Sequence, residues 1–375
     1  MEWKEYQIQD VCRLINGRAY SNDEMLEHGK YKIVRVGNLS GGNSTWFYSD
    51  LELPADKYCH NGDLLFAWAC TFGPHIWKED NTIFHYHIWK IVEDKDVVDR
   101  RFFYYYLKFA IGGFLGALNG SVMVHITKSS MEKMIIRIPK KLEDQRRIAS
   151  ILSSLDRKIE LNNKINADLE EMAQAIFKNW LSECSDDVTI GELSLNITNY
   201  EKTDAEEVVL INSSDVTEGY FDHHNYSPNK NLKGHFKKRF QKGDILYSQV
   251  RPRNRHWAYC NFDANDYLAS TQLMVIRNNP SLITSILLYQ YIISDNVWKE
   301  FTLKTETRSG TFPQGNYEDL SQIRVPYNSD VEGISNQLET LYAKMFMLEK
   351  ESSRLSLLRD TLLPRLMSGE IEIPE

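Results

Sequence analysis

Residues 142–181, LEDQRRIASILSSLDRKIELNNKINADLEEMAQAIFKNWL, combine good helix formers with an apolar spacing that alternates between four and three residues. The seam defined by this spacing consists of Ile148, Leu152, Leu155, Ile159, Asn162, Asn166, Leu169, Ala173, Ile176 and Trp180. An average period of about 3.5 residues is that of a coiled coil. The stretch therefore predicts a long helix that packs along one stripe against another helix.

Two positions of this seam are the asparagines Asn162 and Asn166. A polar residue in a seam costs stability but penalises shifted pairings, in which it would face leucine. We therefore expect the two asparagines to fix the register of the coiled coil. The alternative is a seam displaced by one residue, with Ile165 facing inward and the asparagines on the flank.

A second helix of the same kind is expected over residues 330–368. Leucines recur there every seven residues, and a second line of apolar residues follows them: Leu341, Leu348, Leu355 and Leu362, with Leu338, Met345 and Leu366. Ser329 and Glu332 have the spacing of a capping box, and Gly369 is suited to end the helix. Pro364 removes a backbone hydrogen bond, so we expect the last turn to be bent or broken.

The chain repeats itself around these helices. GDLLFAW at 62–68 returns as GDILYSQ at 243–249, and IRIP at 136–139 returns as IRVP at 323–326. The order predicts two mixed domains, 1–141 and 182–329, each followed by a long helix, at 142–181 and within 330–375. Connectivity makes the two helices antiparallel. The expected fold is α+β (mixed α/β), with a pseudo-two-fold internal repeat.

Composition restricts the function less than the repeat does. The 375 residues are 42% hydrophobic and 26% charged, as in a soluble globular protein, and the net charge of −8 does not suggest a uniformly basic nucleic-acid binder. Five scattered cysteines without a CxxC pair favour reduced thiols, and the start lacks a signal segment. We expect a cytoplasmic protein with no membrane association, in which the apolar run 102–118 is a buried helix.

The helical stretches resemble a known family. Residues 142–180 resemble the central conserved region of the specificity subunit of Type I restriction–modification systems, and LSLLRDTLLPRLMSGEI at 355–371 resembles its distal conserved region. GDLLFAW and GDILYS resemble landmarks of its two target-recognition domains.

This resemblance implies a subunit without catalysis or cofactor of its own. Each globular domain would read one half of a bipartite target in double-stranded DNA, and the helices would set the unread spacer. The implied partners are two methyltransferase (modification) subunits, which use S-adenosylmethionine, and restriction/translocase subunits, which use ATP and Mg²⁺.

The clearest local signal for DNA is residues 230–256, which contain nine basic residues and the single acid Asp244. Candidate phosphate contacts are Lys237, Lys238, Arg239 and Lys242, and candidate base contacts are Ser248, Gln249, Arg251, Arg253, Asn254 and Arg255. The alternative is a basic but merely solvated face.

The first domain offers a less basic loop at 67–78, and each domain has a Ser/Thr-rich loop before its repeated IR motif. The candidates there are Trp68, Thr71, His75 and Lys78, then Lys128 in one Ser/Thr-rich loop and Lys304 and Arg308 in the other. Aromatic residues at such positions also belong to cores, so this half is expected to rely on hydrogen bonds and shape more than on charge.

Catalytic signatures are missing from the sequence. There is no [ND]PP[YFW] methyltransferase motif, no glycine-rich cofactor fingerprint and no P-loop lysine motif. The histidine pairs at 85/87 and 223/224 lack matching ligands for a metal. The competing hypotheses are a coiled-coil scaffold or antirestriction decoy that reads no sequence, and an enzyme with an unrecognised site.

Overall fold

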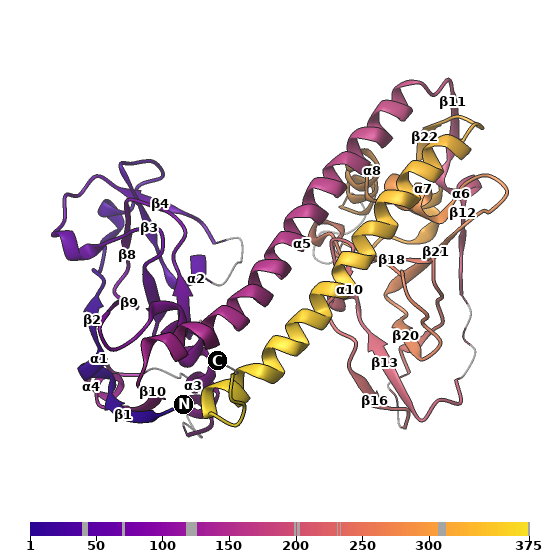
Figure 1. Ribbon diagram of the computed structural model, residues 1–375. Coiled ribbons are helices and arrows are strands. Elements are labelled where there is room, and N and C mark those ends of the chain that lie inside the picture. Colours follow the sequence, from indigo (N-terminus) through magenta and orange to yellow (C-terminus); the bar gives the residue numbers. More distant parts are fainter. Residues whose placement is uncertain are drawn as a thin grey trace. The chain divides into compact units, whose positions relative to one another are not determined.

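The computed structural model describes residues 1–39, 44–69, 72–117, 126–198, 200, 203–230, 232, 234–306 and 313–373, with the backbone only for 112–117. The chain divides into two compact units. The first unit comprises Met1–Leu161 and Glu351–Glu375, and the second comprises Asn162–Lys350. Each unit therefore contains one globular region and a share of both long helices (Figure 1).

The first unit is built from short strands that form two four-stranded sheets and one strand pair. The strands are β1 (Trp3–Gln7), β2 (Cys12–Asn16), β3 (Tyr31–Val34), β4 (Phe47–Ser49), β5 (Tyr58–Cys59), β6 (Leu64–Ala67), β7 (Gly73–Ile76), β8 (Thr82–Phe84), β9 (Ile88–Glu93) and β10 (Ile135–Pro139). The helices are α1 (Ile8–Val11), η1 (Asn22–Glu24), α2 (Val36–Leu39), η2 (Ala55–Lys57), α3 (Arg100–Ala117) and α4 (Lys128–Glu132). The sheet orders are β2-β9-β6-β7 and β4-β3-β8-β5, and β1 pairs with β10.

The second unit has a corresponding set of elements. The strands are β11 (Asp186–Thr189), β12 (Ser194–Asn196), β13 (Glu207–Ile211), β14 (Val216–Thr217), β15 (Tyr220–Phe221), β16 (Tyr226–Pro228), β17 (Phe236–Lys238), β18 (Ile245–Ser248), β19 (Trp257–Tyr259), β20 (Tyr267–Ser270), β21 (Leu273–Asn278) and β22 (Arg324–Tyr327). The helices are α6 (Ile190–Leu193), η3 (Ser213–Asp215), η4 (Pro252–Asn254), α7 (Ser285–Ile293), α8 (Asp295–Glu306) and α9 (Tyr317–Ser321). The sheet orders are β12-β21-β18-β19 and β16-β13-β20-β17, with separate pairs β11-β22 and β14-β15.

The two units share one strand topology. The sheet β2-β9-β6-β7 corresponds strand for strand to β12-β21-β18-β19, and β4-β3-β8-β5 corresponds to β16-β13-β20-β17. Both units also place one parallel pair, β3-β8 or β13-β20, among antiparallel neighbours. The mixed α+β class and the internal repeat are confirmed.

The repeated Gly-Asp dipeptide has the same structural role in both units. Gly62 and Gly243 have φ values of +90° and +92°, in the left-handed region that favours glycine. The carboxylates of Asp63 and Asp244 each accept a hydrogen bond from the backbone amide three residues earlier, at 2.9 and 2.8 Å. Each turn leads into a strand, β6 or β18, in which all four residues are buried. The motif is thus a turn that starts a central strand.

The long helices are α5 (Leu142–Ser182) and α10 (Glu332–Ser368), and their contacts show that they are antiparallel. In the first unit Arg359 Nη1 lies 2.7 Å from Asp156 Oδ1. In the second unit Asn166 Nδ2 donates to the carbonyl of Met345 at 3.2 Å. The later residue of α5, Asn166, thus contacts the earlier residue of α10, Met345, as expected for an antiparallel pair (Figure 1).

The asparagines lie in the seam. Asn162 is fully buried and Asn166 is 7% exposed, whereas the neighbouring Leu161 is 51% exposed. The displaced seam is therefore wrong, because it would have put the asparagines on the flank. That the asparagines fix the register remains a prediction.

The end of α10 differs from expectation. The helix continues through Pro364 to Ser368, so a broken last turn is wrong, while a bent one remains a prediction. The reason is packing, because Leu366 and Met367 are each 2% exposed and belong to the core of the first unit. Gly369 follows with φ of +78° and ends the helix as predicted. No helix among the described residues is long and apolar enough to cross a membrane, and this includes α3.

Replacing both seam asparagines, Asn162→Leu/Asn166→Leu, should not lower the melting temperature but should loosen the register, because leucine does not penalise a shifted pairing. Register is measured by joining introduced cysteines with a short bifunctional thiol reagent, because the observed ion pair spans two long side chains and a disulfide needs Cβ atoms about 4 Å apart. Lys158→Cys with Glu351→Cys reports the observed pairing, since Lys158 Nζ lies 3.4 Å from Glu351 Oε2. Lys158→Cys with Leu358→Cys reports a pairing shifted by one heptad.

We expect only the first cysteine pair to cross-link in the parent chain, and both to cross-link in the leucine variant. Lys164→Leu is the matched control, because Lys164 is exposed on the same helix. Equal cross-linking patterns in the parent and the leucine variant would contradict a register role.

Candidate nucleic-acid interface

The loop that follows β18 in the second unit is held by backbone hydrogen bonds on both sides. Gln249 N donates to Gln272 O at 2.9 Å, and Arg251 N donates to Pro313 O at 3.0 Å. The Ser248 side chain is buried and bonds to the backbone of Val250. Ser248 therefore positions the loop and, contrary to expectation, is not itself available to DNA.

The same loop has an unusual backbone. Arg251 and Arg255 have φ values of 49° and 54°, a region that L-residues with long side chains rarely adopt, and they flank the short helix η4. Trp298 Nε1 on α8 donates to Pro252 O at 2.9 Å and fixes the turn between them. Such strain, of order 1–3 kcal/mol for each residue, is often found at functional sites.

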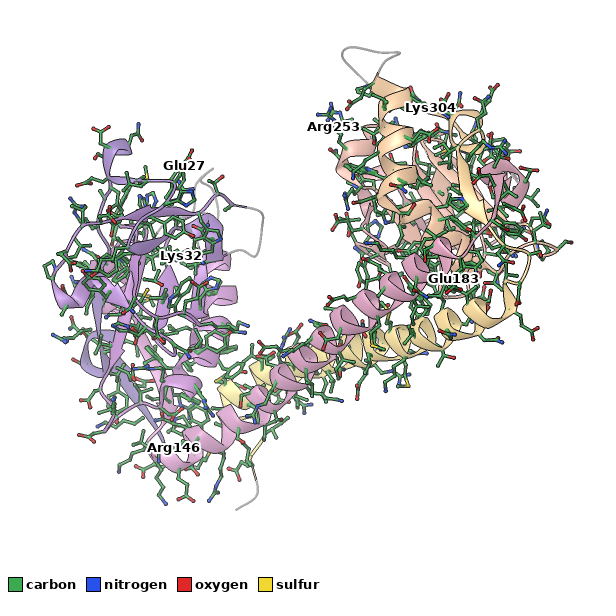
Figure 2. The ribbon with its side chains drawn as sticks, turned by 90° about the horizontal axis from the view of Figure 1, so that it is seen from above. Glu27, Lys32, Arg146, Glu183, Arg253 and Lys304 are labelled. Atoms are coloured by element: carbon green, nitrogen blue, oxygen red, sulfur yellow. The ribbon has the colours of Figure 1, made fainter. Side chains whose placement is uncertain are left out.

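The arginines of this loop differ in their partners. Arg253 Nη2 bonds to Glu306 Oε2 at 2.6 Å, although its side chain is 72% exposed. Arg255 lies 3.4 Å from Asp295 and its guanidinium stacks over Trp298 at 4.3 Å. Both acids lie on α8, Asp295 at its start and Glu306 at its end; Figure 2 labels Arg253 and Lys304 in this part of the second unit. Arg251 and Asn254 of the same loop are exposed.

The four predicted phosphate contacts do not form one surface. Lys237 is exposed in the middle of β17, close to the turn in which Thr271 N donates to His235 O at 2.8 Å. Lys242 is exposed at the other end of the buried strand β18 from Arg251. A strand of four residues is about 13 Å long, so the basic run is divided.

Lys238 and Arg239 also differ from the predicted exposed phosphate contacts. Lys238 is 5% exposed, and its ammonium donates to Leu273 O at 2.6 Å. Burial lowers the pKa of Lys238. Its role as a phosphate contact is wrong, because the side chain ties β17 to the adjacent turn. Arg239 is half-buried, and its Nη1 has no hydrogen-bond partner among the described residues.

The predicted residues of the loop before the second IR motif are only partly described. Lys304 is half-buried and lies 3.1 Å from Glu300, one turn earlier on α8. Arg308 lies outside the described residues. Neither residue adds a cation that the structure places beside Arg251.

The first unit has a corresponding surface at the end of β6. Trp68 N donates to His87 O at 3.1 Å, which matches the bond from Gln249 to Gln272 in the second unit. Trp68, Tyr86 and Lys128 line one cavity of about 380 Å³. Lys128 is paired with Glu132 at 3.6 Å, so this surface carries little net charge.

The turn between β8 and β9 supplies side chains that sequence reasoning did not select for DNA. The rings of Tyr86 and His87 lie 3.9 Å apart, and His87 meets Trp68 at 5.0 Å. Burial lowers the pKa of His85 to about 4, and burial also lowers the pKa of His87. Both imidazoles are therefore neutral near pH 7, and no metal-binding cluster occurs among the described residues. The alignment of the repeats, which pairs this turn with residues 270–272, could have identified them.

The remaining predicted residues of the first domain lie elsewhere. His75 is on β7, where burial and then the charge of Lys108 lower its pKa to about 4. Lys78 is exposed and forms an ion pair with Glu160 on α5. Thr71 lies outside the described residues. The structure therefore groups Trp68 with Lys128 and separates both from His75 and Lys78.

Comparisons with known proteins agree with this architecture. Residues 1–171 match the family described as Type I restriction modification DNA specificity domain. Over 136 residues the chain is 36% identical to the Type I restriction enzyme HindI specificity subunit of Haemophilus influenzae, covering 36% of this chain and 30% of that protein. Over 179 residues it is 25% identical to the EcoBI specificity subunit of Escherichia coli, covering 46% and 36%. The chain thus spans about a third of the length of these relatives.

The fold is also similar to that of a solved protein. The S subunit of a Type I restriction–modification system from M. genitalium matches 98% of this chain and 96% of its own, with a TM-score of 0.63 and 17% identity. At that identity the likeness shows the fold alone. Together with the sequence match of residues 1–171 and the relatives named above, this fold makes the chain similar to the specificity subunits of Type I restriction–modification systems.

Proposed function

We propose that the chain is the DNA-reading subunit of a Type I restriction–modification complex and that each unit reads one half of a bipartite double-stranded target. The observation that carries this proposal is a loop surface that occurs twice on one strand topology. Its backbone hydrogen bond is the same in both units, between residues 68 and 87 and between residues 249 and 272. Its side chains differ, as two readers of different sequences require.

The second unit has the chemistry for a charged and hydrogen-bonding contact. Arg251 suits the O6 and N7 atoms of guanine, and Gln249 and Asn254 suit adenine. Lys237, beside the same turn, would contact phosphate. Because Arg253 is held by Glu306, its contact with DNA would require exchange of one anion for another.

The first unit would depend on uncharged groups. Trp68 and Tyr86 offer apolar surface and hydrogen-bond donors, and neutral His85 and His87 can each donate and accept. Such a surface can distinguish base edges and groove shape, while contributing few phosphate contacts.

The helices would set the unread spacer and hold the partner subunits. A helix of 41 residues, the length of α5, is about 60 Å long. This exceeds one helical turn of DNA, about 34–36 Å. Two methyltransferase subunits with S-adenosylmethionine would methylate adenine, and restriction/translocase subunits with ATP and Mg²⁺ would cleave. This chain would supply the site and the assembly, and its partners the chemistry.

The test is a methylome map of cells that carry the modification subunit, with and without this gene. We expect a gene-dependent N6-methyladenine mark in a two-part motif with a fixed gap. If the complex assembles but no such mark appears, the DNA-reading proposal fails and the scaffold or decoy hypothesis replaces it.

Arg251→Ala should weaken binding to the identified target by about 5- to 150-fold, since a bidentate base contact contributes about 1–3 kcal/mol of discrimination. It should relax one base position of one half-site. Lys237→Ala should instead weaken binding to all sequences alike and reduce the salt slope by about one. Binding is measured with the assembled methyltransferase across a salt series. Arg324→Ala, an exposed arginine on β22, is the control, and an equal loss there would refute the loop assignment.

Tyr86→Ala should relax specificity in the other half-site and leave the salt slope unchanged, because Tyr86 is uncharged and the surface around Trp68 carries little net charge. Motif selection from a random DNA pool, followed by a salt titration, measures both quantities. Tyr226→Ala is the matched control, since Tyr226 is an exposed tyrosine of the second unit. A change of salt slope with an unaltered motif would contradict this role for Tyr86.

A further inference from the structure

The second unit contains a cavity of about 550 Å³ that the proposed DNA-reading surface does not use. It is bounded by α5, α7, α10 and the strands β15 and β19. Its walls are largely aromatic and include Tyr220, Tyr259, Tyr289, Tyr342 and Phe346. Tyr259 and Phe346 stack with centroids 5.6 Å apart, and Tyr289 and Tyr342 meet edge to face at 5.9 Å. Aromatic faces attract cations.

Two carboxylates from different helices line the same cavity. Glu170 on α5 accepts hydrogen bonds from Tyr342 at 2.9 Å and from Gln174 at 3.0 Å, both of which are neutral donors. Glu349 on α10 accepts from Asn261 at 3.4 Å. Burial raises the pKa of Glu349 to about 7. The repulsion from Glu170 also raises this pKa, whereas the hydrogen bond from Asn261 lowers it. Glu170 is thus close enough to oppose the ionisation of Glu349.

A buried amide adds a further acceptor to the cavity. Asn166 is 7% exposed and lines the cavity. Its Nδ2 donates to Met345 O at 3.2 Å, but its Oδ1 is buried without a hydrogen-bond partner among the described residues. An acceptor left in this state costs stability unless a donor reaches it.

Arg255 is a cation in the cavity wall, but it is paired with an acid outside the set described above. Its guanidinium lies 3.4 Å from Asp295 and stacks over Trp298. The cavity is therefore rich in acceptors and aromatic faces.

We propose that this cavity binds an alkylammonium group. The three N–H donors of such a group would be shared by Glu170, Glu349 and Asn166, and its methylenes would pack on the tyrosine rings. A lysine side chain of a partner protein and a free polyamine both end in this group. The inference goes beyond DNA reading and does not depend on it.

The experiment titrates the full-length chain, without DNA, with n-butylammonium and with uncharged n-butanol by isothermal calorimetry. We expect saturable binding of butylammonium and none of butanol. Glu170→Gln should weaken butylammonium binding at least tenfold. Glu171→Gln, an exposed acid of the same helix, should leave it unchanged. Absence of saturable binding, equal binding of butanol, or equal effects of the two variants would overturn the proposal.

A second variant and a pH series keep the test independent of folding defects. In the folded chain Glu349 holds a proton up to about pH 7, so its contribution to stability is lost as pH rises through 7. The groups that interact with Glu349 include Glu170, Asn261, Tyr220 and Tyr289. Glu349→Gln should abolish this fall in melting temperature and should also weaken butylammonium binding. An unchanged affinity in a folded Glu349→Gln variant would contradict the proposal.

Repeating the butylammonium titration with the chain bound to its modification subunits shows whether the alkylammonium group comes from a partner lysine or from a free amine. If a partner lysine fills the cavity, butylammonium binding is lost on assembly and Glu170→Gln weakens assembly. If the ligand is a free amine, binding persists in the complex. Both results uphold the site and assign its occupant.

Discussion

Each globular half of the protein is completed by a helix that begins in the other half. The core of the first unit contains Leu366 and Met367, from the end of α10. The core of the second unit contains Ala173 and Phe177, from the far part of α5. Burial of these side chains is the main favourable term for both helices, since an isolated amphipathic helix is marginal in water. Because each core takes side chains from both helices, the antiparallel pairing is the constraint on which the rest of the structure depends.

This constraint leaves the loops free to vary. The buried strands β6 and β18 and the glycine turns before them hold both sheets in one topology, and the loops at their far ends carry different side chains. Trp68 in one unit and Gln249 in the other occupy the same backbone position but have unrelated chemistry. A fold of this kind can change what each half recognises without changing how the halves are built.

The repeats and the helices could be predicted from sequence because their signals are local and periodic. The seam through Asn162 and Asn166 follows from spacing alone, and the Gly-Asp turns follow from identity between copies. The site was harder to predict. Lys238 stands among exposed cations in sequence, yet the pairing of β17 with β20 turns its side chain toward backbone carbonyls. The grouping of Trp68 with Tyr86, and the cavity between Glu170 and Glu349, depend on contacts between residues distant in the chain, which composition and period do not encode.

The central claim is that the helix pair sets the distance between two readers. It is tested most directly by duplicating one heptad in each helix, residues 155–161 in α5 and 351–357 in α10, and determining the methylated motif in cells. Seven residues are close to two helical turns, so the seam is preserved while the pair lengthens by about 10 Å. The account predicts unchanged half-sites separated by a longer gap. An unchanged gap, or altered half-sites at the original gap, would contradict it.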